Sequence, residues 1–536
     1  MLLALVVFLN GAAVMVLEMA GARLLAPELG TSVVVWTSII GVILASLSLG
    51  YWLGGRLADS VLRETSKKQG KGKKSDAGPR DRAFVILANL LMLASISVFI
   101  TAALGTAAPG AISSLFSSLH LSTIITALTL FALPSTLCGM VSPYAVRLGI
   151  TSSDSSGAVI GRLNAIATVG SIVGTFLGGF VLLSWFSTGS ILLGVACCLL
   201  GTAVLVRARP VLPKAVFGIL LVAAMIGNAG YADWVAKTGF YEENIPLSIE
   251  TSYSSMRVAK GRQYGRDALL LLTDPGSAQS GMYVDDPNEL MFDYTRFYAL
   301  GTALNPDAKR ILMLGGGGYS VPKWLLAGRS GLASDDFSLD VVELDPGMTR
   351  TAAAYFKIDL DDPRLTVFHE DARTFVNRAA AQTLSGQNGP YDLIFADIFN
   401  SWYTVPFHVG TREAAQKIRS LLAEDGVYIM NIISAISGDN GRLLRSIRLA
   451  FMESFEQVDI FPVQQRFNGG LVQNVMLMAR RGQNALPDPE KQAFAPHVAA
   501  LLQNRWSAPF PAPDKDVFAL TDAFAPVERY TLGFLD

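Results

Sequence analysis

Long apolar runs fill the first 230 residues of this 536-residue chain and set the strongest limit on its fold. Each run approaches or exceeds the roughly 20 residues that a helix needs to cross a bilayer. Backbone polar groups must be satisfied internally in lipid, so such runs form helices. We therefore predict a multi-span α-helical membrane domain over residues 1–230. Its apolar runs lie at 2–22, 33–55, 83–105, 121–147, 157–184, 188–206 and 214–230.

The amino-acid composition is also typical of a protein that interacts with the lipid bilayer. Hydrophobic residues make up 51% of the chain and charged residues 16%, which is too apolar for a wholly soluble protein. The net charge of -1 gives no reason to expect nucleic acid. Cys138, Cys197 and Cys198 all fall in apolar stretches, so we expect packed thiols, with no disulfide framework and no metal site.

Basic residues between the apolar runs predict the orientation. The loop 58–82 is rich in lysine and arginine, and cytoplasmic loops carry such an excess. The same rule places Arg147, Arg162 and the linker 207–214 on the cytoplasmic side, with the arginine-free loop 106–119 outside. Seven full crossings would then put the domain that follows on the opposite side. Either the seventh run is interfacial or re-entrant, or a boundary differs, or the domain is external.

Two features within the apolar runs are unusual. Glu18 is costly in a span and is expected to face the bundle interior with Arg23 or another arginine as its partner, as a structural or functional pair. Small residues also recur in the fifth run, which predicts close helix contact and leaves transport as a minority interpretation. These small residues are Gly161, Ala165, Gly170, Gly174, Gly178 and Gly179.

A glycine run dominates the second half of the chain. Ile311 to Leu314 reads as a buried parallel strand, and it leads directly into Gly315, Gly316, Gly317 and Gly318. Ser320 then opens a helical pattern. A strand, a turn without side chains and a helix N-terminus let a nucleoside ligand lie against bare backbone amides.

Acidic residues end the strands that follow. The second strand, 338–344, carries Glu343 and is followed by Asp345, so a carboxylate there can accept both hydroxyls of a ribose. A third strand, 365–368, precedes Asp371, and a fourth, 391–398, contains Asp397. Strands that alternate with helical patterns predict a doubly wound sheet with its ligand at the carboxyl edge. The run lacks G-x-G-x-x-G spacing, which favours a single adenosyl group over NAD.

These segments together are similar to the polyamine aminopropyltransferases, the spermidine synthase family. The similarity rests on 311–319, 341–345, 369–372 and 391–400, and it continues upstream through 250–254, 270–274 and 279–280. It covers roughly residues 248–480, and the preceding spans resemble those of integral-membrane members of the family. The resemblance implies a small antiparallel sheet followed by a Rossmann-like seven-stranded sheet of the adenosylmethionine-dependent methyltransferase type.

The resemblance also assigns roles to individual residues. Glu343 would hold the ribose, with Asp345 beside it, and Asp371 with Ala372 would contact the adenine edge. Gln279 would lie on the sulfonium side, against the glycine run. Asp397 takes the position of the family's catalytic carboxylate, which deprotonates or orients the attacking amine; as an alternative, Asp397 would only cap a helix.

Three departures fall on the amine side of the expected site. The family has an aspartate where this chain has Gly318, and a second aspartate where this chain has Asn400. Its Tyr-His-Glu segment appears here as Phe292-Asp293-Tyr294. Loss of an anion at Gly318 leaves space for a substrate carboxylate and removes a charge that would repel it.

The pattern favours S-adenosylmethionine itself as substrate, over its decarboxylated form. Its own carboxylate would attack the γ carbon and give 5'-methylthioadenosine and homoserine lactone, a lyase reaction without an acceptor pocket. Aminocarboxypropyl transfer, spermidine synthesis with a site rebuilt from Asp293, Tyr294 and Tyr403, and methyl transfer stay open, as does a sensor or transporter that binds adenosyl compounds without catalysis. No further cofactor is expected, and a homodimer is left open.

Domain boundaries follow from the same features. We expect a small β-sheet domain at 231–300, with strands at 250–260 and 268–273, and the catalytic domain at 301–485, with late strands at 457–463 and 473–480. The tail 486–536 is expected to be a helix followed by extended surface chain. Because the adenosyl ligand is cytosolic, we place this domain on the cytoplasmic face of a bacterial inner membrane.

Overall fold

A computed structural model shows two compact units, Met1–Glu242 and Glu243–Asp536. The composition changes near residue 231, whereas the units separate later because helix α9, Val211–Thr238, continues past that point. The structure describes residues 1–29, 33–69, 79–105, 107–116, 118–150, 156–238, 247–251, 253–274, 277–399, 406–464, 469–482, 486–488, 494–513, 515–531 and 534.

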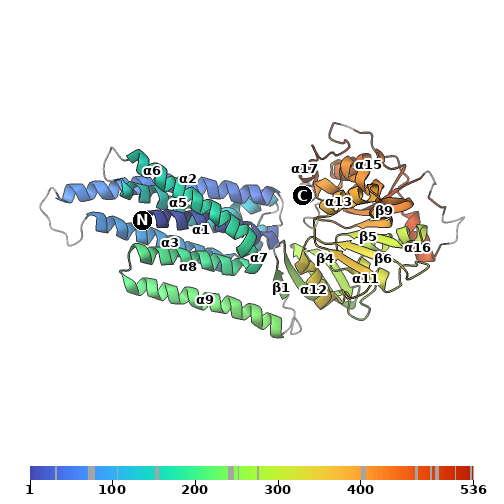
Figure 1. Cartoon of the computed structure of the whole chain (residues 1–536), viewed down its shortest axis with the longest axis horizontal. Helices are drawn as coiled ribbons and strands as arrows, with labels where there is room; N and C mark the ends of the chain where they lie inside the picture. Colours follow the sequence, from blue (N-terminus) through green and yellow to red (C-terminus); the bar gives the residue numbers. More distant parts are fainter. Residues whose placement is uncertain are drawn as a thin grey trace. The chain divides into compact units, whose positions relative to one another are not determined.

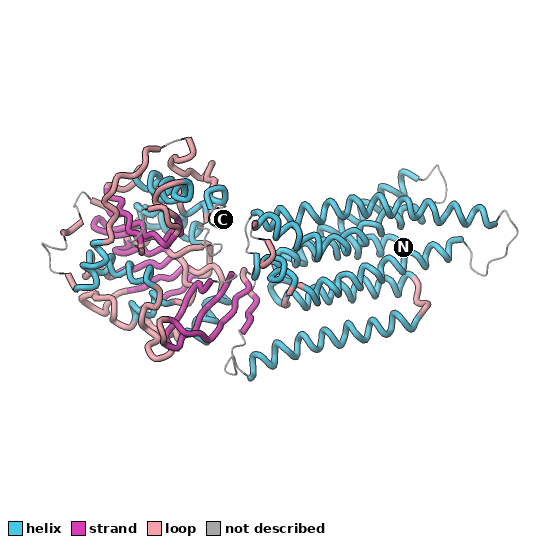
Figure 2. Tube along the Cα trace, turned by 180° about the vertical axis from the view of Figure 1, so that it is seen from behind, coloured by secondary structure: helices cyan, strands magenta, loops and turns pink. Residues whose placement is uncertain are grey.

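The first unit is a bundle of helices that run alongside one another (Figures 1 and 2). Besides α9, its helices are α1 Leu2–Leu29, α2 Val33–Gln69, α3 Pro79–Leu104, α4 Ala108–Ser113, α5 Leu119–Gly149, α6 Ser156–Phe176, the π-helix η2 Leu177–Leu182, α7 Leu183–Trp185 and α8 Thr188–Val206. The most extensive helix contacts are those of α2 with α5, α1 with α6, and α3 with α8.

Six stretches of this unit are long and apolar enough to cross a membrane. They are Leu2–Ala26, Val34–Leu62, Asp81–Leu104, His120–Gly149, Ser156–Leu182 and Thr188–Val206. The seventh run of the sequence forms α9, but its apolar part within the described residues, Val211–Gly227, is shorter than these six. The finding indicates membrane association with six candidate spans, one fewer than the sequence suggested.

Glycines bring the backbones of paired helices into contact. A Cβ atom on Gly170 would lie 2.1 Å from the carbonyl oxygen of Phe8, and one on Gly174 would lie 2.5 Å from that of Ala12, so only glycine fits between α6 and α1. The predicted close packing is therefore confirmed at these two positions. It does not extend to Gly161, where a Cβ atom would have no neighbour within 4 Å.

The expected pairing of Glu18 is wrong within the described residues, where Glu18 forms no ion pair. Arg23 donates instead to the carbonyl oxygen of Leu183 in α7, at 2.6 Å. A carbonyl at the end of the π-helix offers this arginine an acceptor that sequence spacing does not reveal.

The second unit begins with an antiparallel sheet in the order β1-β2-β3-β4. Its strands are Leu247–Glu250, Ser255–Gln263, Arg266–Asp274 and Ser277–Tyr283. The single strand expected over 250–260 is thus wrong: β1 ends at Glu250, and the amide of Thr251 donates to the carbonyl of Ser254 to close a turn before β2. The predicted strand at 268–273 lies within β3.

The larger sheet has seven strands in the order β10-β11-β9-β8-β5-β6-β7, as the methyltransferase-type prediction requires. Strands β5 to β9 pair in parallel, and β10 and β11 are antiparallel. The strands are β5 Arg310–Leu314, β6 Ser338–Val342, β7 Leu365–Phe368, β8 Tyr391–Ala396, β9 Leu422–Ser434, β10 Gln457–Pro462 and β11 Gln473–Arg480.

Helices cover both faces of this sheet (Figure 1). On β5, Leu312 and Leu314 pack into one core cluster, while Ile311 and Met313 pack into the other, as expected for a strand buried on both sides. The helices are η3 Asp293–Tyr298, α10 Ala299–Leu304, α11 Ser320–Leu326, α12 Pro346–Phe356, α13 Ala372–Leu384, η4 Phe407–Val409, α14 Arg412–Leu421, η5 Asp439–Gly441, α15 Arg442–Met452, α16 Pro496–Gln503 and α17 Val527–Thr531.

Residues 520–530 contribute to the core, which corrects the expectation of extended surface chain after the helix. Leu520 is fully buried, and Val527 and Tyr530, both in α17, are at most 4% exposed. All three pack into the same apolar cluster as β9 and α13. Large apolar side chains spaced through a proline-rich tail were the signal for this.

Candidate active site

The glycine turn after β5 has no free backbone donor. The amide of Gly315 donates to the carbonyl of Val342, those of Gly316 and Gly317 donate to Glu343 Oε2 at 2.9 and 3.2 Å, and that of Gly318 donates to Ser280 Oγ at 2.9 Å. The expectation of bare amides facing a ligand is therefore wrong. The turn uses its donors to hold protein oxygens, so it is not a phosphate cradle.

Left-handed backbone favours glycine at two positions of this turn. Gly315 has a φ of +92°, and a Cβ atom there would lie 2.2 Å from the carbonyl oxygen of Asp397. Gly317 has a φ of +50°. Left-handed backbone and the close approach of β8 together exclude larger residues. The turn thus brings the ends of β5 and β8 into direct contact.

Glu343 stands at the end of β6, where the sequence placed the ribose ligand. Its Oε2 accepts the two glycine amides, and its Oε1 accepts the amide of Asp345 at 2.9 Å. Burial raises the pKa of Glu343, and these three amide hydrogen bonds oppose that rise. Each carboxylate oxygen can accept more than one hydrogen bond, so Oε1 keeps acceptor capacity for a hydroxyl.

Asp345 has a different function from its neighbour. It is 4% exposed, and its carboxylate accepts the amide of Gly347 at 2.8 Å as the N-cap of α12. Its other oxygen accepts the hydroxyls of Thr251, at 2.5 Å, and Ser254, at 2.9 Å. The carboxylate therefore links the turn between β1 and β2 to the N-terminus of α12. This structural role could not be inferred from the position of Asp345 in the sequence.

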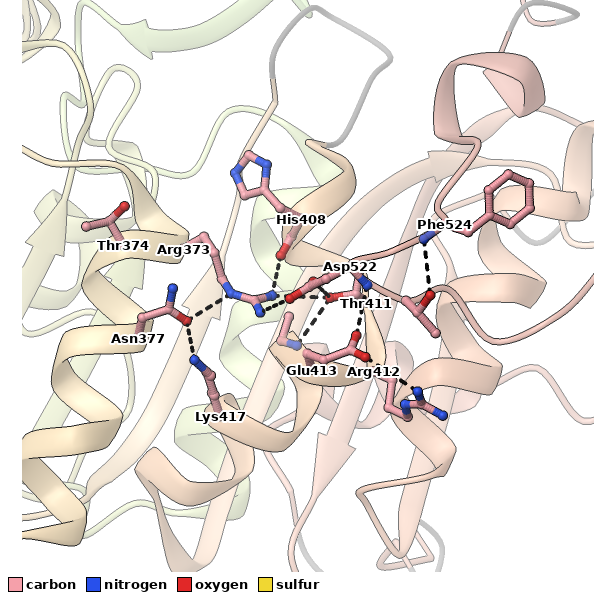
Figure 3. Close-up of polar contacts among 12 residues, drawn as sticks. Arg373, Thr374, Asn377, His408, Thr411, Arg412, Glu413, Lys417, Asp522 and Phe524 are labelled. Carbon is pink, nitrogen blue, oxygen red and sulfur yellow. Dashed lines mark hydrogen bonds and ion pairs between the residues drawn. The ribbon is translucent and has the colours of Figure 1, made fainter.

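Asp371 and Ala372 begin α13, beside β6 and β7. Asp371 caps the helix through the amide of Thr374 at 2.9 Å, and its second oxygen lies 3.3 Å from Nε2 of His408. The backbone carbonyl of His408 in turn accepts from Arg373 at 2.6 Å, as Figure 3 shows. His408 thus joins the expected adenine edge, although the sequence analysis did not select it.

Asp397 follows β8 and is held by two neutral donors. The hydroxyl of Tyr294 donates to Oδ2 at 3.0 Å, and the side-chain amide of Asn431 donates to Oδ1 at 2.9 Å. Burial raises the pKa of Asp397, and these two hydrogen bonds oppose that rise. The alternative that Asp397 caps a helix falls on residues 400–405, which lie outside the described residues.

Gln279 and Ser280 come from β4, which lies over the glycine turn. Gln279 Oε1 is buried without a hydrogen-bond partner among the described residues. A buried acceptor without a donor is costly, so its position suits a ligand that brings one. Ser280 is bound to the amide of Gly318, which fixes β4 against the turn.

Asp293, another sequence candidate, lies apart from this group. Asp293 is exposed and pairs with Arg296 at 3.4 Å, while its other oxygen lies 3.4 Å from the hydroxyl of Tyr264. Asn400 and Tyr403 lie outside the described residues. Sequence reasoning missed Asn431, although an asparagine inside the apolar strand Val427 to Ile433 was a signal that something polar must face it.

The seven-stranded sheet and its strand order define a fold of the methyltransferase type. The chain is 32% identical over 222 residues to a polyamine aminopropyltransferase of Vibrio vulnificus, which is 41% of this chain and 66% of that protein. It is 27% identical over 267 residues to a polyamine aminopropyltransferase of Corynebacterium efficiens, covering 46% of this chain and 47% of that protein. No family model matches the sequence.

Two solved structures also align with this chain. A probable spermidine synthase from Corynebacterium glutamicum has 22% identity and a TM-score of 0.39 over 48% of this chain and 86% of its own. A spermidine synthase from Thermotoga maritima has 17% identity and a TM-score of 0.34, over 50% and 84%. The chain is thus similar in sequence to polyamine aminopropyltransferases, and it spans between about half and two thirds of the length of these two relatives.

Proposed function

We propose that this protein binds a sulfonium derivative of adenosine and cleaves its alkyl C–S bond, releasing 5'-methylthioadenosine. The observation that carries the proposal is Asp397, a partly buried carboxylate at the junction of β5 and β8. It is held by a tyrosine and an asparagine, and no cation neutralises it among the described residues. An anion prepared in this way can attract a sulfonium or the ammonium group of its substrate.

The adenosyl half of the substrate would lie along the carboxyl edge of the sheet. Glu343 would accept the ribose hydroxyls, and Asp371 with Ala372 would meet the adenine. The glycine amides are occupied by protein oxygens, which suits a nucleoside without phosphates. The buried Oε1 of Gln279 would accept a donor from the alkyl side of the substrate.

Within this reaction class we favour S-adenosylmethionine itself as the substrate. Its carboxylate oxygen would attack the γ carbon, the C–S bond would break, and its electron pair would leave with methylthioadenosine. The products are methylthioadenosine, which is neutral, and homoserine lactone, which keeps the substrate's ammonium charge, so no proton is transferred in the step. Gly318 supports this choice because the family's aspartate at that position would repel the substrate carboxylate.

Polyamine aminopropyl transfer is the second candidate, and the 32% identity to the Vibrio vulnificus protein favours it. A diamine would then attack the decarboxylated substrate, and Asp397 would remove or orient its proton. The two reactions differ in proton balance. Amine attack releases a proton, whereas lactone closure does not. A measurement of proton release during turnover therefore distinguishes the two reactions, whichever amine is the acceptor.

We further infer that the first unit lies in the membrane and that the second is cytoplasmic. Six crossings return the chain to the side on which it starts, and the loops rich in arginine then share that side. An engineered cysteine in the exposed turn at Tyr264, in sealed inside-out vesicles, would react with a membrane-impermeant maleimide. Reaction only in right-side-out vesicles would place the unit outside.

The deciding experiment incubates detergent-purified protein with S-adenosylmethionine or its decarboxylated form, with and without putrescine, and identifies the products by mass spectrometry. Methylthioadenosine and homoserine lactone from adenosylmethionine alone support the lyase. Product that needs the decarboxylated form and putrescine supports aminopropyl transfer. Tight binding without product, unchanged in Asp397→Asn, would make the unit a sensor and refute both enzymatic proposals.

A further inference from the structure

A pair of asparagines connects Asp397 to the far strands of the sheet. Asn431, in β9, is 2% exposed and donates its side-chain amide to Asp397 Oδ1 at 2.9 Å. Its own Oδ1 accepts the side-chain amide of Asn474, in β11, at 3.1 Å. Three side chains from three segments thus form one continuous line of hydrogen bonds. The line ends at the carboxylate on which the proposed reaction depends.

Sheet register places these residues together. Ala396 pairs with Met430 across β8 and β9, so Asp397 comes next to Asn431. Across the antiparallel pair, Asn474 lies opposite Ile433, two residues beyond Asn431 and on the same face of β9. Diagonal neighbours of this kind are within reach of each other's side chains. The register of β8, β9 and β11 therefore determines this line of hydrogen bonds.

We propose that Asn431 and Asn474 are positioning residues that orient the carboxylate of Asp397 and keep it in its ionised form. This inference rests on the function proposed above, in which ionised Asp397 is the active form. Neither side chain touches the substrate in this proposal. Asn431 acts on Asp397 directly, and Asn474 acts through Asn431.

The physical reason lies in the direction of the amides. An amide donor stabilises a carboxylate most when water is excluded, because the local dielectric constant is low. Asn474 donates to the oxygen of Asn431, which leaves the NH2 group of Asn431 facing Asp397. Without Asn474 the amide of Asn431 could turn, and its oxygen would then oppose the carboxylate instead of binding it.

Neutral residues suit this task better than an arginine or a lysine. A fixed cation beside Asp397 would stabilise its charge, but it would also repel a sulfonium substrate. Two amides supply hydrogen bonds without adding charge. The titratable groups that face Asp397 within the described chain are Tyr294, which bonds to it, and Tyr298, which donates to the carbonyl of Ala396 at 2.9 Å. Both are phenols that are neutral near neutral pH, and burial, followed by the charge of Asp397, raises their pKa values further.

The test compares Asn431→Leu and Asn474→Leu with the wild type in the full-length, detergent-purified protein. The quantity measured is kcat/KM for methylthioadenosine release as a function of pH. Loss of the donor raises the pKa of Asp397, so we expect the acidic limb to move upward by about one pH unit in Asn431→Leu. Activity well above that limb should approach the wild-type value.

Asn474→Leu should shift the limb in the same direction by a smaller amount. It should add no further shift in the Asn431→Leu background, because it acts only through that residue. Gln473→Leu is the matched control, since Gln473 is a buried amide on the same strand that bonds to Gln464 and not to the site. An unchanged pH profile in Asn431→Leu, or an equal shift from Gln473→Leu, would overturn the proposal.

Binding separates this inference from the proposed function. If the wild type releases no product from either substrate, the proposed function fails, and calorimetry with S-adenosylmethionine then tests the asparagines alone. Affinity for the cationic ligand should fall as Asp397 becomes protonated, and this midpoint should move upward in Asn431→Leu. Identical binding midpoints in the variant and the wild type would overturn the positioning role.

Discussion

Ser280 occupies the space that a side chain on Gly318 would need. A Cβ atom built on Gly318 would lie 2.7 Å from the Cβ atom of Ser280, closer than real atoms approach, and Ser280 Oγ accepts the amide of Gly318 at 2.9 Å. Glycine at 318 and serine at 280 are thus matched to each other. The absence of the family's aspartate is therefore part of how β4 packs on the turn.

Restoring that aspartate alone should harm the protein. We expect Gly318→Asp to lower the free energy of unfolding of the second unit by about 1–3 kcal/mol, because either β4 or the turn must shift. It should not confer putrescine-dependent activity. Gly318→Asp combined with Ser280→Gly should recover most of the stability, since the obstructing atoms are gone.

Thermal unfolding and product analysis check this expectation. Gly470→Ala is a suitable control, because a Cβ atom there meets nothing within 4 Å. The matching of Gly318 and Ser280 is refuted if Gly318→Asp is as stable as the control. Putrescine-dependent product from that single variant would further show that the amine site needs only this residue.

Sequence patterns predicted most strands of the larger sheet in the second unit. Apolar strands and their acidic ends placed Glu343, Asp371 and Asp397 at one edge, and the late strands at 457–463 and 473–480 were found almost at their bounds. These patterns succeed because strand burial and turn glycines leave a local trace in the sequence.

Contacts between distant segments left no such trace. Nothing local shows that the glycine amides bind Glu343 and Ser280, because the acceptors lie 26 to 38 residues away. The link from Asn474 to Asn431 needs the order of β9 and β11, which sequence alone did not give. Asp345 had the right position for a ligand residue, yet hydroxyls of Thr251 and Ser254 bind its carboxylate.

Lys323 should make stability depend on pH. Its ammonium group, in a side chain only 4% exposed, donates to the carbonyls of Pro287 and Phe356 at 2.9 and 2.7 Å. Burial, with a smaller contribution from the charge of Lys357, lowers the pKa of Lys323 from 10.5 to about 8. Between these values the unfolded chain binds the proton and the folded chain does not, so stability rises with pH.

The expected gain over this window is about 3 kcal/mol relative to Lys323→Met, which has no proton to lose. Unfolding followed by tryptophan fluorescence at pH 7.5 and pH 10 measures it, since Trp324 adjoins Lys323 in α11. Lys309→Met, at an exposed position, controls for the other titrating groups. If the wild type and Lys323→Met respond equally to pH, then Lys323 is not the source.

The glycines of α6 provide a matched pair of variants in the membrane unit. Gly170→Ala should destabilise the bundle by about 1–3 kcal/mol, because its Cβ atom would lie 2.1 Å from the backbone oxygen of Phe8 and α6 would have to move away from α1. Gly161→Ala should be neutral or slightly stabilising, since it meets nothing within 4 Å and alanine favours a helix. Thermal unfolding in detergent compares the two, and equal effects would contradict the packing seen here.

The C-terminal segment should support the adenine edge of the site. Asp522 accepts Arg373 Nη2 and the hydroxyl of Thr411, each at 2.6 Å, and Arg373 also donates to the carbonyl of His408 (Figure 3). Arg373 is 9% exposed, so its charge depends on this carboxylate. Because Asp522 is itself 45% exposed, we expect Asp522→Asn to cost only about 1–2 kcal/mol.

The loss should be local and should reach the ligand. Hydrogen exchange should quicken in residues 406–411 and 517–531, and the affinity for S-adenosylmethionine should fall several-fold, because His408 and Asp371 lose their fixed positions. Glu453→Gln removes an exposed ion pair with Arg412 and serves as the control, with a cost of at most about 0.5 kcal/mol. Unchanged exchange and affinity in Asp522→Asn would mean that the tail is held by Leu520 and Tyr530 alone and takes no part in the site.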